Sequence, residues 1–179
     1  SQRMNTIKVT PTTASKIDSI DFKNLGFGTV FSDHMLVCDY KNGIWGTPEI
    51  VPFQPISLMP SAKIFHYGQS IFEGMKAYKD VDKKTWLFRP DENFKRFNIS
   101  AKRLSIPELP EAVFMEGLKA LLKVDEQWIP TQDGSSLYIR PIIFATGEGF
   151  HASPADAYKF MICTAPSGAY FAGKVKVLI

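Results

Sequence analysis

Two features in the sequence could bind a small anionic ligand, and the first is a tyrosine two residues before an arginine. Tyr138 and Arg140 lie two residues apart in the segment SLYIRP, which begins at Ser136. In an extended strand such residues point to the same face, so a phenol and a guanidinium would lie side by side. The pair could bind a carboxylate. The alternative interpretation is the polar outer face of a half-buried sheet.

Arg96 supplies a second guanidinium, on a predicted helix. Pro90, Asp91 and Glu92 are typical of a helix start, because proline fits the first turn and carboxylates suit the positive end of the helix dipole. An arginine in the next turn could donate a forked pair of hydrogen bonds to a phosphate. The alternative is a surface arginine paired with Glu92 at i−4.

An aromatic-rich segment, HYGQSIFEGMKAY, begins at His66 and could wall a pocket for a small ligand. Tyr67 and Phe72 are its candidate lining residues, and the alternative is that both are ordinary core aromatics. The three histidines of the chain show no metal-ligand spacing, so no metal site is predicted. They are His34, His66 and His151.

Composition narrows the class of protein. The chain has 179 residues, 45% hydrophobic and 22% charged, and a net charge of +3. This charge is too small and dispersed for a nucleic-acid-binding surface. No apolar run is long enough to span a membrane, and the first residues lack the apolar segment of a signal peptide. Cys38 and Cys163 form no CxxC motif and are expected to be small buried residues of a reduced, cytoplasmic protein.

Hydrophobic periodicity and turn residues predict six strands, two main helices and one short helix. The strands are expected over residues 35–40, 49–53, 75–79, 85–88, 137–145 and 158–165. The short helix is expected over residues 69–73, ended by Gly74. The main helices are expected to begin at Pro90, with a stripe of Phe94, Phe97, Ala101 and Leu104, and after Pro110, with a stripe of Phe114, Leu118, Leu121 and Leu122. This order indicates an α+β fold with a largely antiparallel sheet and two main helices.

Taken together, the motifs closely resemble those of the branched-chain-amino-acid aminotransferases, pyridoxal-phosphate enzymes of fold type IV. The matching segments are FGTVFSDHML from Phe27, HY at His66, FEGMKA from Phe72, LFRP from Leu87 with Asn93 and Arg96, SLYIRP from Ser136, and PSGAYF from Pro166. They occur in one order between Phe27 and Phe171. The HYG, FEG and RP pieces recur across fold type IV, whereas FGTVFSDHML and SLYIRP indicate the branched-chain group.

The resemblance implies a role for each matching residue. Arg96 is expected to bind the phosphate of pyridoxal 5′-phosphate. Tyr138 and Arg140 are expected near the substrate, where Arg140 can meet the side-chain carboxylate of glutamate. The aromatic residues implied around the substrate side chain are Phe27, Phe72 and Tyr170. Tyr67 is expected to complete the pocket of the partner subunit of a homodimer, and Phe150 and Ala152 to lie in a loop that reaches across the dimer.

One departure from the family concerns the catalytic lysine. The family's Schiff-base lysine would lie downstream of this chain, and Lys174 and Lys176 match no catalytic motif, so no catalytic residue is expected here. The chain therefore resembles the N-terminal small domain of such an enzyme, inactive by itself. We expect an arm over residues 1–24, the small domain over 25–171, and the start of a connection to a second domain over 172–179.

The implied function is exchange of the amino group of leucine, isoleucine or valine with 2-oxoglutarate, within branched-chain amino-acid biosynthesis. Small molecules are the expected ligands, without nucleic acid or membrane. Two alternatives stay open. One is another fold type IV enzyme, either a D-amino-acid aminotransferase or an aminodeoxychorismate lyase. The other is a non-enzymatic binding module on the same fold.

Overall fold

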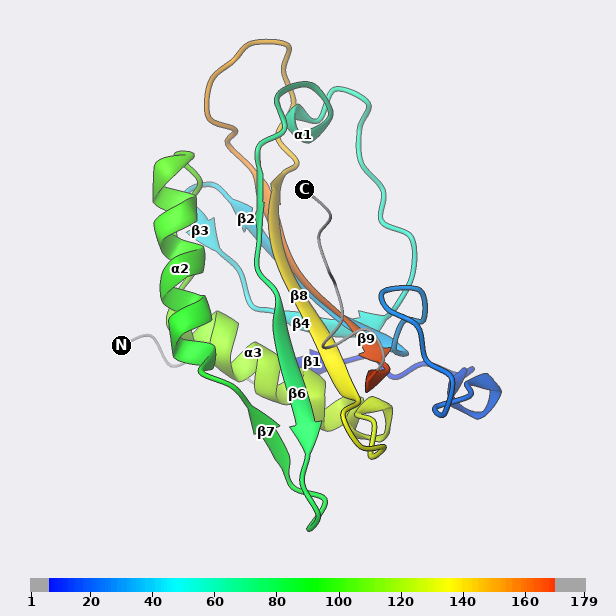
Figure 1. The fold of residues 1–179 in the computed structure, drawn as a ribbon. Coiled ribbons are helices and arrows are strands. Elements are labelled where there is room, and N and C mark those ends of the chain that lie inside the picture. The colour runs from blue at the N-terminus through cyan, green and yellow to red at the C-terminus, as the bar shows by residue number, and fades with distance from the viewer. Residues whose placement is uncertain (1–6, 170–179) are drawn as a thin grey trace, which may run out of the picture.

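The computed structural model describes residues 7–169, which form a mixed α+β fold around one curled sheet (Figure 1). The described strands follow the order β1-β4-β2-β9-β8-β6-β7, with β3 paired to β2 and β5 to β8. They are β1 (Lys8–Val9), β2 (His34–Lys41), β3 (Ile44–Trp45), β4 (Glu49–Pro52), β5 (Ser70–Phe72), β6 (Met75–Lys79), β7 (Thr85–Leu87), β8 (Ser136–Ala145) and β9 (Tyr158–Ser167). All pairs are antiparallel except β1 with β4, so the predicted fold class is confirmed.

Two helices, α2 (Pro90–Arg103) and α3 (Glu111–Val124), lie together beside one face of the sheet (Figure 1). A short helix α1 (Lys63–Tyr67) lies at the far end, next to the loop between β8 and β9, and single 3-10 turns occur at Ile17–Ser19 and Glu126–Trp128. None of the helices in residues 7–169 combines the length and apolar character needed to cross a bilayer.

The core lies between the two helices and the sheet. Phe97 of α2, Phe114 of α3 and Phe160 of β9 are fully buried, with ring centroids 5.8–6.2 Å apart. Helix α3 approaches β2 closely at Gly117, where a Cβ atom would stand 2.7 Å from Leu36 Cδ2. Only glycine allows this approach, so the helix rests directly on the strand.

The main helices and the central strands are confirmed. Pro90 occupies the first turn of α2, and Phe94, Phe97 and Ala101 lie on its inward side. The prediction that Leu104 belongs to this stripe is wrong, because Leu104 caps the end of the helix and is 51% exposed.

The short helix predicted over residues 69–73 is wrong. Ser70–Phe72 is strand β5, paired with β8 through Ile71 opposite Ile143, and its exposure alternates with period two. The short helix lies earlier, at Lys63–Tyr67, and ends at Gly68 in the left-handed conformation. The glycine that ends a helix is therefore Gly68 and not Gly74, because pairing of residues 70–72 with β8 overrides the weak local helix signal.

The described part, 7–24, of the arm expected over residues 1–24 is attached to the rest of the fold. Strand β1 pairs with β4 in parallel, and Phe22 stacks at a tilt on Trp128 with centroids 6.2 Å apart. The Thr12 N–H donates to Nε2 of His34 at 3.0 Å. Polar composition does not reveal these attachments, because they depend on residues distant in sequence.

A buried polar network fixes the arm and the end of α3 to the start of β2. Because Nε2 of His34 accepts from Thr12, its Nδ1 must carry the proton that it donates to Asp125 at 2.7 Å. Asp33 Oδ1 accepts from the Lys16 N–H, and Oδ2 accepts from Ser15 Oγ and, at 3.0 Å, from Trp128 Nε1. His34 is thus held by hydrogen bonds at both ring nitrogens and links the arm to the end of α3.

The Asp33 network predicts an acid-dependent loss of stability. Burial raises the pKa of the Asp33 carboxyl, but hydrogen bonds from Lys16, Ser15 and Trp128 outweigh it and lower the pKa below 3.8. A lowered folded-state pKa stabilises the protein above the unfolded value, and this contribution disappears as the pH falls through the folded value. We expect Asp33→Asn to lower the free energy of unfolding by about 1–3 kcal/mol at pH 7 and by less below pH 4.

Urea unfolding followed by fluorescence between pH 7 and pH 3 measures this difference. Asp82→Asn, in an exposed turn, is the matched control and should change little. A difference for Asp33→Asn that stays constant across this pH range would contradict the assignment.

Candidate functional site

Tyr138 and Arg140 project from β8 on the face of the sheet opposite α2 and α3. Arg140 Nη2 donates to the Tyr138 hydroxyl at 2.9 Å, and the guanidinium carbon lies 4.4 Å from the centroid of the Phe72 ring. The expected side-by-side placement of the phenol and the guanidinium is confirmed. Phe72 adds a cation–π contact that holds Arg140 over its ring.

Tyr138 and Arg140, but not Phe72, line a cavity of about 350 Å³. Its lining residues are Phe27, Gly28, Phe31, Tyr138, Arg140, Cys163, Thr164 and Ala165. The Phe27 ring meets Tyr138 edge-on, with centroids 5.0 Å apart. Burial raises the pKa of the Cys163 thiol to about 11, so the thiol is neutral and forms part of an apolar wall. The cavity therefore combines aromatic surface with one cationic group.

Arg96 forms an ion pair that neither sequence interpretation foresaw. Its Nε donates to Oε1 of Glu73 at 2.6 Å and its Nη2 to Oε2 at 2.7 Å, whereas Glu92 is not hydrogen-bonded to it. The Glu73 side chain is 8% exposed and that of Arg96 is 66% exposed. Burial raises the pKa of the Glu73 carboxyl, but the hydrogen bonds from Arg96 and Asn93 and the charge of Arg96 bring it below its usual value.

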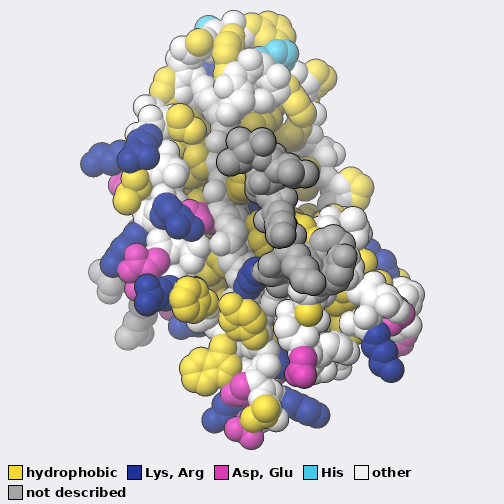
Figure 2. All heavy atoms as spheres, viewed as in Figure 1, with side chains coloured by type: hydrophobic (Ala, Val, Ile, Leu, Met, Phe, Trp, Pro, Cys, Tyr) yellow, Lys and Arg dark blue, Asp and Glu magenta, His cyan; other side chains and the backbone are white. Residues whose placement is uncertain are grey.

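A second cavity, of about 460 Å³, opens beside Arg96. It is lined by Gly74, Met75, Lys76, Tyr78, Phe88, Arg89, Glu92, Asn93 and Arg96. Three of these side chains are cationic and one is anionic, so the cavity favours an anion. Hydrophobic side chains gather beside it over the β6–β7 hairpin (Figure 2), where Tyr78, Trp86 and Phe88 are exposed.

Gly74 joins the two cavities. It lines the cavity at Arg96, and a Cβ atom on it would stand 2.6 Å from the hydroxyl oxygen of Tyr138, which lines the other cavity. Gly74 therefore brings a lining residue of the Arg96 cavity into contact with a lining residue of the Arg140 cavity.

The remaining predicted residues lie elsewhere. Tyr67 of α1 is 38% exposed, and Phe150 and Ala152 are exposed in the loop between β8 and β9. Neither cavity includes these three residues. Phe150 packs edge-on against His66, with centroids 5.0 Å apart, so the loop and α1 form one aromatic end of the molecule. Tyr170 lies outside the described residues.

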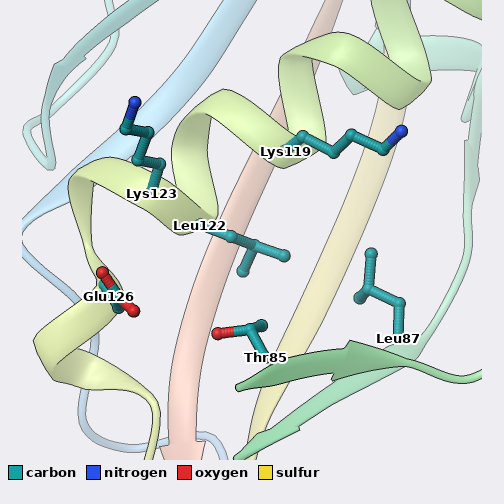
Figure 3. A pocket seen from close by; sticks show the side chains of 6 residues that line it. All are labelled: Thr85, Leu87, Lys119, Leu122, Lys123 and Glu126. Atoms are coloured by element: carbon teal, nitrogen blue, oxygen red, sulfur yellow. The ribbon is translucent and has the colours of Figure 1, made fainter. Parts of the chain in front are cut away.

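A third cavity, of about 320 Å³, lies between α3 and β7 (Figure 3). Leu87 and Leu122 face it, whereas Lys119 and Lys123 extend away from α3 (Figure 3). No residue predicted to bind a ligand lines it. Among residues 7–169 no three His, Cys, Asp or Glu side chains come together as a possible metal site.

Sequence reasoning missed Glu73 and Gly74 as site residues. Glu73 is a carboxylate between two apolar stretches, and a charge in that position requires a partner if it is buried. This signal could have pointed to an ion pair. It could not have named Arg96, because the partner lies on a helix whose position depends on the whole fold.

Comparison with known proteins extends these observations. No protein-family model matches the chain. It is 45% identical over 152 residues to branched-chain-amino-acid transaminase 1 of Bacillus subtilis (strain 168), covering 84% of this chain and 43% of that protein. It is also 45% identical over 174 residues to the probable branched-chain-amino-acid aminotransferase of Staphylococcus aureus (strain N315), covering 97% and 46%.

The chain is similar in sequence to part of proteins named as branched-chain-amino-acid aminotransferases. It spans less than half the length of the curated relatives that it matches. Among solved structures, the branched-chain amino acid aminotransferase of Escherichia coli matches with a TM-score of 0.60 and 25% identity, over 79% of this chain and 42% of that one.

A second solved branched-chain amino acid aminotransferase carries a bound ligand. This enzyme, from T.th., is complexed with N-(5′-phosphopyridoxyl)-L-glutamate and matches with a TM-score of 0.50 and 29% identity, over 71% of this chain and 39% of that one. The aminotransferase fold thus accounts for the described sheet and its two helices.

The contact of Gly74 with Tyr138 predicts that a single methyl group disturbs the site. In Gly74→Ala the new Cβ would overlap the Tyr138 hydroxyl, so the ring must shift, which disturbs its hydrogen bond with Arg140. We expect a loss of stability of about 1–3 kcal/mol, as for other overpacked positions.

Gly46→Ala is the matched control, because its Cβ would stand 3.5 Å from the nearest atom, an ordinary contact. Thermal unfolding of both variants and a crystal structure of Gly74→Ala provide the measurements. Equal melting temperatures for the two variants, with Tyr138 unmoved, would show that the site tolerates the methyl group.

Proposed function

We propose that the intact protein containing this chain is a pyridoxal 5′-phosphate-dependent branched-chain-amino-acid aminotransferase. It exchanges the amino group of leucine, isoleucine or valine with 2-oxoglutarate, and this chain forms its small N-terminal domain. The observation that carries the proposal is the pair of cavities, one with Arg96 and one with Arg140, whose lining residues Gly74 and Tyr138 are in contact. Relatives 45% identical that are named as such aminotransferases support it.

The residues of the Arg96 cavity fit the phosphate of the cofactor. The Arg96 side chain is exposed to the cavity, and Lys76 and Arg89 add positive charge. When bound, pyridoxal phosphate supplies the electron sink that amino-group transfer requires. The ligand of the T.th. enzyme joins a phosphopyridoxyl group to glutamate. A molecule of this kind would need one hydrogen-bond donor for its phosphate and another for its carboxylate. Arg96 and Arg140 are these donors in our proposal.

The Arg140 cavity suits both kinds of substrate. Phe27 and Tyr138 offer apolar surface to a branched side chain, whose burial contributes about 25 cal/mol per Å², and Phe72 lies beside them against Arg140. Glutamate brings a carboxylate to the same place, and Arg140 can pair with it so that no charge is buried alone. We assign Tyr170 to the same wall.

We assign the aromatic end of the molecule, formed by α1 and the loop between β8 and β9, to contact with a second subunit. Tyr67 would complete the partner's pocket in a homodimer, and the loop with Phe150 and Ala152 would cross to the partner. Phe65 and Phe150 support this role, because they are 61% and 74% exposed in the single chain. We place the enzyme in the cytoplasm, in branched-chain amino-acid biosynthesis.

The catalytic lysine is assigned to the part of the intact protein outside this chain. Residues 1–179 are therefore expected to be inactive by themselves. The test of the proposed function is aminotransfer by the intact protein from L-leucine to 2-oxoglutarate. Activity with D-alanine or aminodeoxychorismate in place of L-leucine would favour the other fold type IV enzymes, and no turnover of any of them would favour a binding module.

Arg96→Ala should weaken cofactor retention. The variant loses the guanidinium that faces the cavity, so we expect the dissociation constant for pyridoxal phosphate to rise at least about tenfold, with little change in the preference among substrates. Spectroscopic titration of the intact apoprotein measures the constant. An unchanged value would mean that Arg96 serves only as the partner of Glu73.

Arg140→Leu should separate the two half-reactions. Glutamate loses its charged partner, which should cost about 2–5 kcal/mol, whereas leucine loses none. Single-turnover rates of the intact enzyme with each amino acid provide the measurement. If both rates fell equally, Arg140 would act on the sheet or the dimer and would not recognise the side chain.

A further inference from the structure

Glu73 occupies a buried position between the two faces of the sheet. It lies between β5 and β6, its N–H donates to the Pro141 carbonyl at 3.0 Å, and 7% of its surface is exposed. The neighbouring side chain of Phe72 faces Arg140. A buried carboxylate is retained only with strong partners, and here those partners come from α2.

The ion pair engages one edge of the Arg96 guanidinium and leaves another available. Glu73 accepts from Nε and from Nη2, and Asn93 Nδ2 also donates to Glu73 Oε2 at 3.2 Å. A guanidinium has five N–H donors, so both hydrogens of Nη1 and one of Nη2 remain. These form a second forked edge on a side chain that lines the 460 Å³ cavity.

We propose that Glu73 is a positioning residue that holds Arg96 so that its second forked edge meets the cofactor phosphate. The inference rests on the proposed function and extends it to a residue with no contact to the ligand. Arg96 is exposed on one side of a helix, and without Glu73 its long side chain would sample many rotamers. Fixing the rotamer in advance removes part of the entropy that phosphate binding would otherwise cost.

The alternative role for the ion pair is purely structural, as a link between α2 and the sheet. That role predicts that changing Glu73 alters stability and affects all cofactor forms alike. A positioning role predicts an effect on the phosphate contact alone. Pyridoxal, which lacks the phosphate, distinguishes the two.

The experiment titrates the intact apoprotein with pyridoxal phosphate and with pyridoxal, by absorbance, in matched variants. Glu73→Gln keeps the length of the side chain but places an amide NH2 against one of the two Arg96 donors, so the fork is lost. We expect the affinity for pyridoxal phosphate to fall about tenfold. A loss of about this size is typical when a metal-binding side chain loses the hydrogen-bond partner that orients it. The affinity for pyridoxal should stay unchanged.

Three further variants sharpen the result. Asp39→Asn removes the carboxylate of another ion pair, 2.8 Å from Lys159, and should change neither affinity. Glu73→Asp keeps the charge but is too short for both donors, so it should show a smaller loss, and it serves if Glu73→Gln does not fold. The double variant Glu73→Gln, Arg96→Ala should bind no more weakly than Arg96→Ala alone, because Glu73 acts through Arg96.

The outcomes separate this inference from the proposed function. If Arg96→Ala lowers phosphate-dependent affinity but both Glu73 variants bind normally, the inference is overturned and the function stands. Equal losses for pyridoxal phosphate and pyridoxal, or additive losses in the double variant, also overturn it. If the unsubstituted protein binds both compounds equally, then the phosphate role of Arg96 fails and the role of Glu73 fails with it.

Discussion

The alternation of side chains along β8 and β9 is the constraint on which the rest of the structure depends. The two strands pair over ten residues each, from Ser136 opposite Ser167 to Ala145 opposite Tyr158. Leu137 and Ile139 are fully buried towards the helices, whereas Tyr138 and Arg140 face the other way. A shift of one residue would exchange the two sets and bury a guanidinium in the core. Core packing therefore sets the register that builds the site.

The segment from Phe72 to Gly74 connects the two faces of this sheet. Phe72 contacts Arg140, Glu73 binds Arg96 of the helical layer, and Gly74 touches Tyr138. One short segment thus contacts both guanidinium groups, that of Arg140 through Phe72 and that of Arg96 through Glu73. Because the segment is extended and pairs with β8, its side chains alternate and reach both layers.

Local signals predicted those parts of the fold that local physics determines. Proline at the start of α2 and the long apolar runs of β8 and β9 correctly predicted these elements. Strand β5 and the attachment of residues 7–24 depend on partners far along the chain, so composition misled there. The same holds for the site. The spacing of Tyr138 and Arg140 predicted their contact, whereas Glu73 could be identified as the partner of Arg96 only from the assembled fold.

The two arginines differ in how firmly they are held, and this suits different ligands. Arg96 is bound by a buried carboxylate through two short charge-assisted hydrogen bonds, so its orientation is fixed before a ligand arrives. Arg140 forms no ion pair within residues 7–169 and rests on the Phe72 ring and one phenol. A cation–π contact and one hydrogen bond to a neutral hydroxyl hold a guanidinium less firmly than two hydrogen bonds to a carboxylate. In the proposed function, the rigid Arg96 would meet the phosphate of a cofactor that stays bound through many turnovers, whereas the loosely held Arg140 would serve a pocket that receives an apolar side chain and a carboxylate in turn.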